Sequence, residues 1–114
     1  LTTWEGYQGS VWTGLGGGNP WATKTSNFTA AANDRLFVDT SGGAVTITLP
    51  ASPLTGDEVS IVDVSGSFDS NNCTVGRNSE KIMGAAEDLV ITQENAGIKL
   101  AYSGSTNGWR LVNN

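Results

Sequence analysis

The chain has 114 residues, a length that predicts one domain with a modest core. Its formal net charge is −5, and only 15% of its residues are charged. Its six Lys and Arg residues are scattered, which argues against nucleic acid as a partner because phosphate binding needs several converging cations. No apolar stretch approaches the ~20 residues of a membrane span, so we expect no membrane insertion.

Residues 1–22 differ in composition from the rest of the chain. They contain Trp4, Trp12 and Trp21, three of the four Trp residues, and a Gly-rich tract that ends in Asn-Pro. Such a tract is unsuited to the interior of a strand or helix. We therefore expect residues 1–22 to form a linker or shaft-collar segment and residues 23–114 to form the globular domain.

The rest of the sequence consists of short segments rich in β-branched residues and separated by turn residues. Residues 45–49, for example, alternate apolar residues with Thr, which is typical of a strand with one buried face. This pattern predicts an all-β fold, a short-stranded antiparallel sandwich or jelly-roll-like domain. The expected strands are 23–29, 35–40, 44–49, 58–64, 73–77, 88–92, 97–102 and 108–112.

The segments between these strands carry recognisable turn signals. Residues 41–43, Ser-Gly-Gly, suit a hairpin. The motif Val-Asp-x-Ser-Gly occurs at 38–42 and again at 62–66, and each Asp is expected to accept hydrogen bonds from turn amides. Residues 82–88 are compatible with one helical turn.

Alternation also predicts which residues form the core. Residues 59–64 are apolar on both faces, which indicates a central strand or a subunit contact. Cys73 is expected to be a small buried residue. The residues predicted to face inward are Leu36, Val38, Val45, Ile47, Leu49, Val59, Ile61, Leu89, Ile91, Ile98, Leu100, Tyr102, Trp109 and Leu111.

The residue types leave little room for catalysis. There is no His, so the usual Ser or Cys triads are excluded, and a single Cys excludes both an intrachain disulfide and the usual zinc ligands. Adjacent acids such as Asp57 and Glu58 point to opposite faces of a strand and make poor catalytic pairs. We expect no enzymatic activity, no cofactor and no metal site.

Sugar binding is the most plausible small-molecule role, because aromatic rings stack on pyranoses while Asp and Asn pair with hydroxyl groups. Residues 69–72 form an oxygen-rich loop, but they lack the Gly and distal Glu of an EF-hand loop. The candidate ligand-binding residues are Tyr7, Trp12, Trp21, Asp69, Asn71 and Asn72.

Residues 33–112 resemble a domain found in bacteriophage tail-fibre and virion structural proteins. The segments that carry the resemblance are 34–43, 45–53, 56–57, 62–63, 72–75, 82–84, 87–88 and 108–111. Residues 4–6 and 9–18 also resemble the junctions between modules of such fibres.

This resemblance implies a homotrimeric all-β module near the C-terminus of a virion tail fibre, where it attaches to the host cell surface, often through polysaccharide. The expected mechanism is multivalent adhesion. Two alternatives stay open: a purely structural trimerisation or capping module of a fibre or baseplate, and a carbohydrate-binding module of a cellular enzyme.

Overall fold

The computed structural model describes residues 18–112, which form nine strands and no helix. It follows that no helix of this part is long and apolar enough to cross a membrane. Seven of the eight expected segments each contain one strand, and the expected segment 23–29 is divided in two. The strands are β1 (Trp21–Lys24), β2 (Phe28–Thr29), β3 (Arg35–Val38), β4 (Val45–Thr48), β5 (Glu58–Asp63), β6 (Cys73–Gly76), β7 (Leu89–Ile91), β8 (Gly97–Tyr102) and β9 (Trp109–Leu111).

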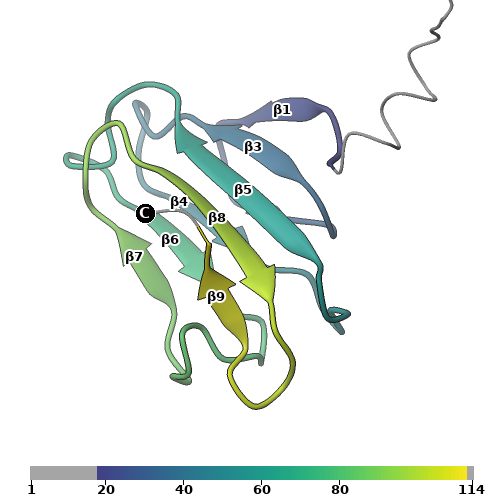
Figure 1. The fold of residues 1–114 in the computed structure, drawn as a ribbon. Coiled ribbons are helices and arrows are strands. Elements are labelled where there is room, and N and C mark those ends of the chain that lie inside the picture. The colour runs from purple at the N-terminus through teal and green to yellow at the C-terminus, as the bar shows by residue number, and fades with distance from the viewer. Residues whose placement is uncertain (1–17, 113–114) are drawn as a thin grey trace, which may run out of the picture.

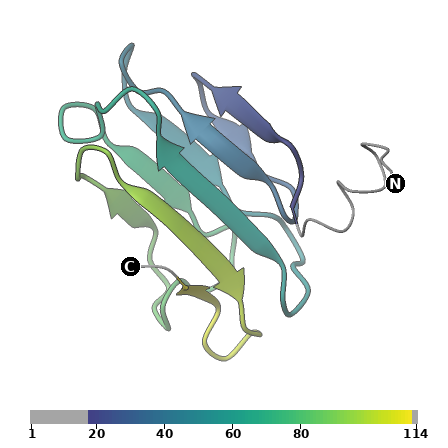
Figure 2. The same cartoon turned by 45° about the horizontal axis from the view of Figure 1, so that its top comes forward.

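The strands form two mixed sheets that pack face to face (Figures 1 and 2). One has the order β1-β3-β5-β8-β9 and the other the order β2-β4-β6-β7. From β1 to β6 the chain changes sheet at every step, and each strand pairs in parallel with the strand two places before it. Consecutive strands therefore form the turns of a flattened coil, and β7, β8 and β9 complete the two sheets with antiparallel pairs.

The expected all-β, sandwich-like architecture is confirmed, but the expected antiparallel pairing is wrong for the first six strands. Residues 41–43 do not close a hairpin, because they lead the chain from β3 in one sheet to β4 in the other. The turn is tight all the same, with the amide of Gly43 donating to the carbonyl of Thr40 at 3.0 Å. The alternation of apolar and polar residues indicates which face of a strand is buried. It does not indicate whether the next strand pairs in a hairpin or crosses to the other sheet.

The core lies between the sheets and largely matches the predicted residues. Eleven of the predicted fourteen are buried, among them Trp109, and so is Cys73. Leu89 and Ile98 are only partly buried, and Leu111 is exposed, which is a correction to the prediction. Alternation missed Phe68, a fully buried residue in the loop between β5 and β6.

The loop that contains Phe68 is anchored by Asp63 at the end of β5. Val38 and Asp63 lie opposite each other in neighbouring parallel strands, so Asp63 occupies an inward-facing position. Its carboxylate accepts the amides of Ser67 at 3.0 Å, Phe68 at 3.1 Å and Asn95 at 2.9 Å. The prediction that the Asp of each Val-Asp-x-Ser-Gly motif accepts turn amides is confirmed, since Asp39 accepts the amide of Ser41 in the same way.

Candidate functional site

The structure places the predicted ligand-binding residues in separate regions. Tyr7 and Trp12 lie outside the described residues. Trp21 lies on β1, opposite Arg35 at the start of β3 and in line with Ser60 of β5. The loop with Asp69 follows the opposite end of β5, at least about 10 Å further along the strands. Trp21 and this loop therefore do not form one site.

Within the loop, two of the three predicted residues are used by the fold. The side-chain amide of Asn71 donates to the carbonyl of Thr40 at 2.8 Å, and the carbonyl of Asn72 accepts the amide of Val45 at 3.2 Å. Both interactions tie the loop to the neighbouring turn of the coil. The side chain of Asp69 is exposed. Across residues 18–112, no three His, Cys, Asp or Glu side chains gather as a metal site would require.

The perturbed ionisable groups have structural causes. Burial raises the pKa of Asp63, but the backbone amides of Phe68, Ser67, Asn95 and Gly66 outweigh burial and leave that pKa lowered. Burial, and to a lesser degree the charge of Asp63, raises the pKa of the Cys73 thiol to about 12.

Tyr102 is the third such group. Its hydroxyl donates to Glu80 at 2.6 Å, and this hydrogen bond is the main reason that its pKa is raised. The pair joins β8 to the segment before Ile82, so its role is to hold that segment in place.

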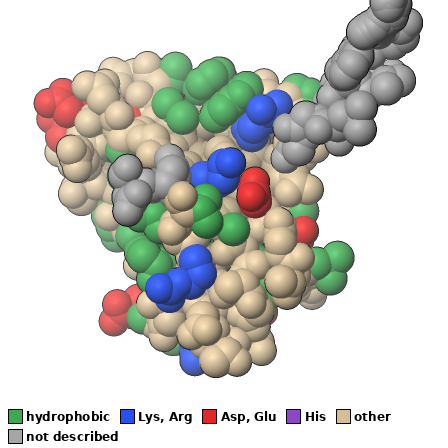
Figure 3. Space-filling model, viewed as in Figure 1, with side chains coloured by type: hydrophobic (Ala, Val, Ile, Leu, Met, Phe, Trp, Pro, Cys, Tyr) green, Lys and Arg blue, Asp and Glu red, His purple; other side chains and the backbone are tan. Residues whose placement is uncertain are grey.

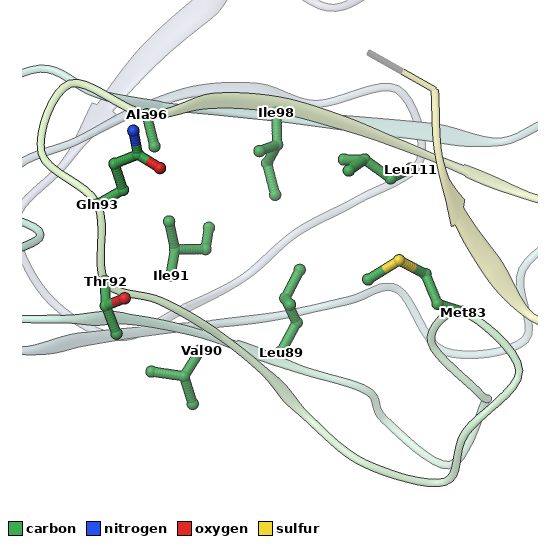
Figure 4. A pocket seen from close by; sticks show the side chains of 9 residues that line it. All are labelled: Met83, Leu89, Val90, Ile91, Thr92, Gln93, Ala96, Ile98 and Leu111. Carbon is green, nitrogen blue, oxygen red and sulfur yellow. The ribbon is translucent and has the colours of Figure 1, made fainter. Parts of the chain in front are cut away.

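An apolar groove of about 280 Å³ lies at the open side of the sandwich (Figure 4). Leu89 and Ile91 of β7 line one wall, and Ile98 of β8 and Leu111 of β9 line the other, with their side chains pointing toward one another. Met83 closes one end. The core is therefore accessible from this side.

The strand beside the groove also has one edge without a strand partner in the part of the chain that the structure describes. β7 is the last strand of the four-stranded sheet, and among residues 18–112 it pairs only with β6. Val90 of β7 is 48% exposed, and Val112, which follows β9, is exposed as well. An apolar groove beside an open strand edge is suited to contact with another polypeptide.

The outer face of the five-stranded sheet has a different character. In Figure 3, Lys and Arg side chains are spread over this face beside a group of hydrophobic side chains. Trp21 stacks on Phe37 with ring centroids 4.6 Å apart and an interplanar angle of 15°. The guanidinium carbon of Arg35 lies 5.5 Å from the Trp21 ring centre. Sequence reasoning missed Arg35, because only the pairing of β1 with β3 brings it beside Trp21.

A scan against models of known protein families finds no match for this chain, and a search of curated proteins finds no similar sequence. The sequence resemblance, the apolar groove and the outer sheet face are therefore the observations from which the function is inferred.

Proposed function

We propose that this chain is a non-catalytic module of a bacteriophage tail fibre that forms a homotrimer and attaches the virion to polysaccharide on the host surface. The fibre assignment follows the sequence resemblance. The apolar groove is the observation that supports the homotrimer, because it places apolar side chains from both sheets at the surface of a small domain.

Burial of the groove by a second copy of the chain would be favourable. Met83 is 41% exposed and Leu111 37% exposed. Covering the part of each side chain that is still exposed contributes about two fifths of the ~1.5–3 kcal/mol of a fully exposed one, or roughly 0.6–1.2 kcal/mol each. Soluble oligomers are usually closed and built from identical chains, so one groove per chain suits a ring of copies. The unpaired edge of β7 adds backbone groups that a neighbouring copy can reach.

The attachment part rests on the outer face of the five-stranded sheet. There an exposed Trp21 stands next to a cation, Arg35, and three copies of such a face on one rigid tip gain avidity that a single face lacks.

The groove equally favours a second candidate, a purely structural module that trimerises or caps a fibre without binding the host. That candidate predicts the same assembly but no affinity for polysaccharide. A carbohydrate-binding module of a cellular enzyme, in contrast, is expected to be monomeric.

The first experiment is the solution mass of the chain, measured by light scattering after size exclusion at several concentrations. We expect about three times the 11.8 kDa of one chain. L111E adds a charge to the groove and should give monomers. L54E adds the same charge at an exposed residue outside the groove and should remain trimeric.

Circular dichroism of each variant checks that the fold is kept. A wild-type monomer at every concentration would refute the proposed assembly, and so would a folded L111E variant that is still a trimer.

A further inference from the structure

We propose that the outer face of the five-stranded sheet is the binding surface for an acidic polysaccharide, with a sugar ring against Trp21 and a carboxylate on Arg35. This inference rests on the proposed function and specifies its ligand class. The residues that carry it come from the five strands of this sheet, which lie side by side in the order β1, β3, β5, β8 and β9.

The first argument is the distribution of charge. The chain carries eleven acids and six cations, yet the strand positions that face outward on this sheet hold three cations, Arg35, Lys99 and Arg110, and one acid, Glu58. Glu58 lies 3.7 Å from Lys99. An acidic protein therefore presents a face with an excess of positive charge, which attracts an anionic ligand.

The second argument is that Arg35 is held in place through one of its donors, while its other guanidinium donors have no hydrogen-bond partner within residues 18–112. Its Nε donates to the carbonyl of Asn19 at 2.7 Å. The chain passes so close that a Cβ on Gly18 would lie 2.8 Å from Nε of Arg35, so a side chain at that position would force the guanidinium to shift. Among residues 18–112 this is the one hydrogen bond of the guanidinium, so its terminal N–H groups are available to a carboxylate.

The third argument is the stacked ring beside this cation. Trp21 is 40% exposed, and Phe37 supports one side of it. An aromatic surface next to a fixed guanidinium offers the two contacts that a uronic acid needs, apolar C–H groups against the ring and a carboxylate on the cation.

The face is also long enough for several sugar units. From β1 to β8 there are three strand spacings, about 14 Å in all. The outward position in register between Arg35 and Lys99 is Ser60 of β5. Along that strand, Val62 lies on one side of Ser60, and Glu58, the ion-pair partner of Lys99, lies on the other. Among the described residues, a serine is thus the side chain in register between Arg35 and Lys99.

The same charge pattern disfavours nucleic acid. A nucleic acid carries a phosphate at every nucleotide and needs several converging cations. Three cations with a carboxylate among them, on a chain with net charge −5, suit a polymer whose charges are further apart.

The test uses the full chain and oligogalacturonate as the probe, with its fully methyl-esterified form as the uncharged control. Binding is measured by isothermal titration calorimetry at low and high salt. We expect binding of the acidic form only, weakened by salt because surface charges are screened. R35Q and W21A should each weaken binding about tenfold or more.

Two matched variants control for charge and for exposed apolar area. K81Q removes a cation that lies outside the sheet, and L54A removes an exposed apolar side chain from a loop, so both should leave the affinity unchanged. G18A should displace Arg35 and weaken binding while the circular dichroism spectrum is kept.

The inference is overturned if the protein does not bind oligogalacturonate, if the methyl-esterified form binds equally well, if a single-stranded oligonucleotide competes equally well, or if K81Q weakens binding as much as R35Q. Its failure is distinguishable from that of the proposed function. A trimer without affinity for the acidic form refutes the ligand class alone, whereas a monomer refutes the assembly whatever it binds.

Discussion

Asp63 anchors the loop between β5 and β6, so replacing it with Asn should destabilise the fold. The carboxylate accepts three amides, with Ser67 on one oxygen and Phe68 and Asn95 on the other. Asn has a single acceptor oxygen, and its best orientation keeps Phe68 and Asn95 while its NH₂ group meets the amide of Ser67.

The size of the effect follows from these three contacts. A buried donor without a partner costs about 1–3 kcal/mol, and each of the two remaining hydrogen bonds loses about 1 kcal/mol when its acceptor is no longer charged. Together they give about 3–5 kcal/mol, which is a large fraction of the ~5–15 kcal/mol that stabilises a typical domain.

The assay is urea unfolding followed by circular dichroism at fixed protein concentration, with D69N as the control. Asp69 lies in the same loop but is exposed, and D69N should change the free energy of unfolding by less than about 0.5 kcal/mol. A D63N variant as stable as D69N would refute the assigned role of the carboxylate.

The pH dependence gives a second check on the same residue. The pKa of Asp63 is lowered in the folded state, so its contribution is complete above the ordinary carboxyl pKa of about 3.9 and is lost as the pH falls below it. The stability difference between wild type and D63N should therefore shrink in acid. A difference that is constant with pH would contradict the argument.

Two further predictions concern buried positions. G108A should lower the free energy of unfolding by about 3 kcal/mol or more. Gly108 has a φ of +69°, and a Cβ there would fall on the carbonyl of Lys81, which accepts the amide of Trp109. G42A is the control, because the added methyl group meets open space there. Urea midpoints that are equal for G108A and G42A would contradict the predicted clash. Cys73 is buried and the pKa of its thiol is raised to about 12, so a maleimide should label it about a thousandfold more slowly in the native chain than in urea; similar rates would show that the site is open.

The strands and most of the core could be predicted because alternation reports directly on burial. The parallel pairing could not, because β3 and β5 are joined only through β4, which lies in the other sheet. Residues 82–85 illustrate a second limit. They form a tight turn in place of the expected helical turn, with positive φ at Met83 and Gly84, and Ile82 pairs with both Ala85 and Trp109.

The candidate surfaces were harder to predict than the strands. The composition favoured Trp21 as an exposed ring, but Arg35 joins it only through the register of β1 against β3. The groove depends on Met83 and Leu111, which are 28 positions apart in sequence. They line the same groove because the amide of Met83 donates to the carbonyl of Trp109 in β9 at 2.7 Å. Phe68 did leave a signal, since it is the sole apolar residue between Val64 and Cys73.

The alternation between sheets also affects how the chain acquires its structure. Trp21 lies opposite Arg35, 14 positions later, and Val45 lies opposite Cys73, 28 positions later. Each parallel pair therefore loses the conformational entropy of closing a loop before its hydrogen bonds form. β8 and β9, in contrast, meet across a short connection. During synthesis β5 would emerge long before β8, its antiparallel partner, and we expect the sheet to become stable only when the last strands have left the ribosome.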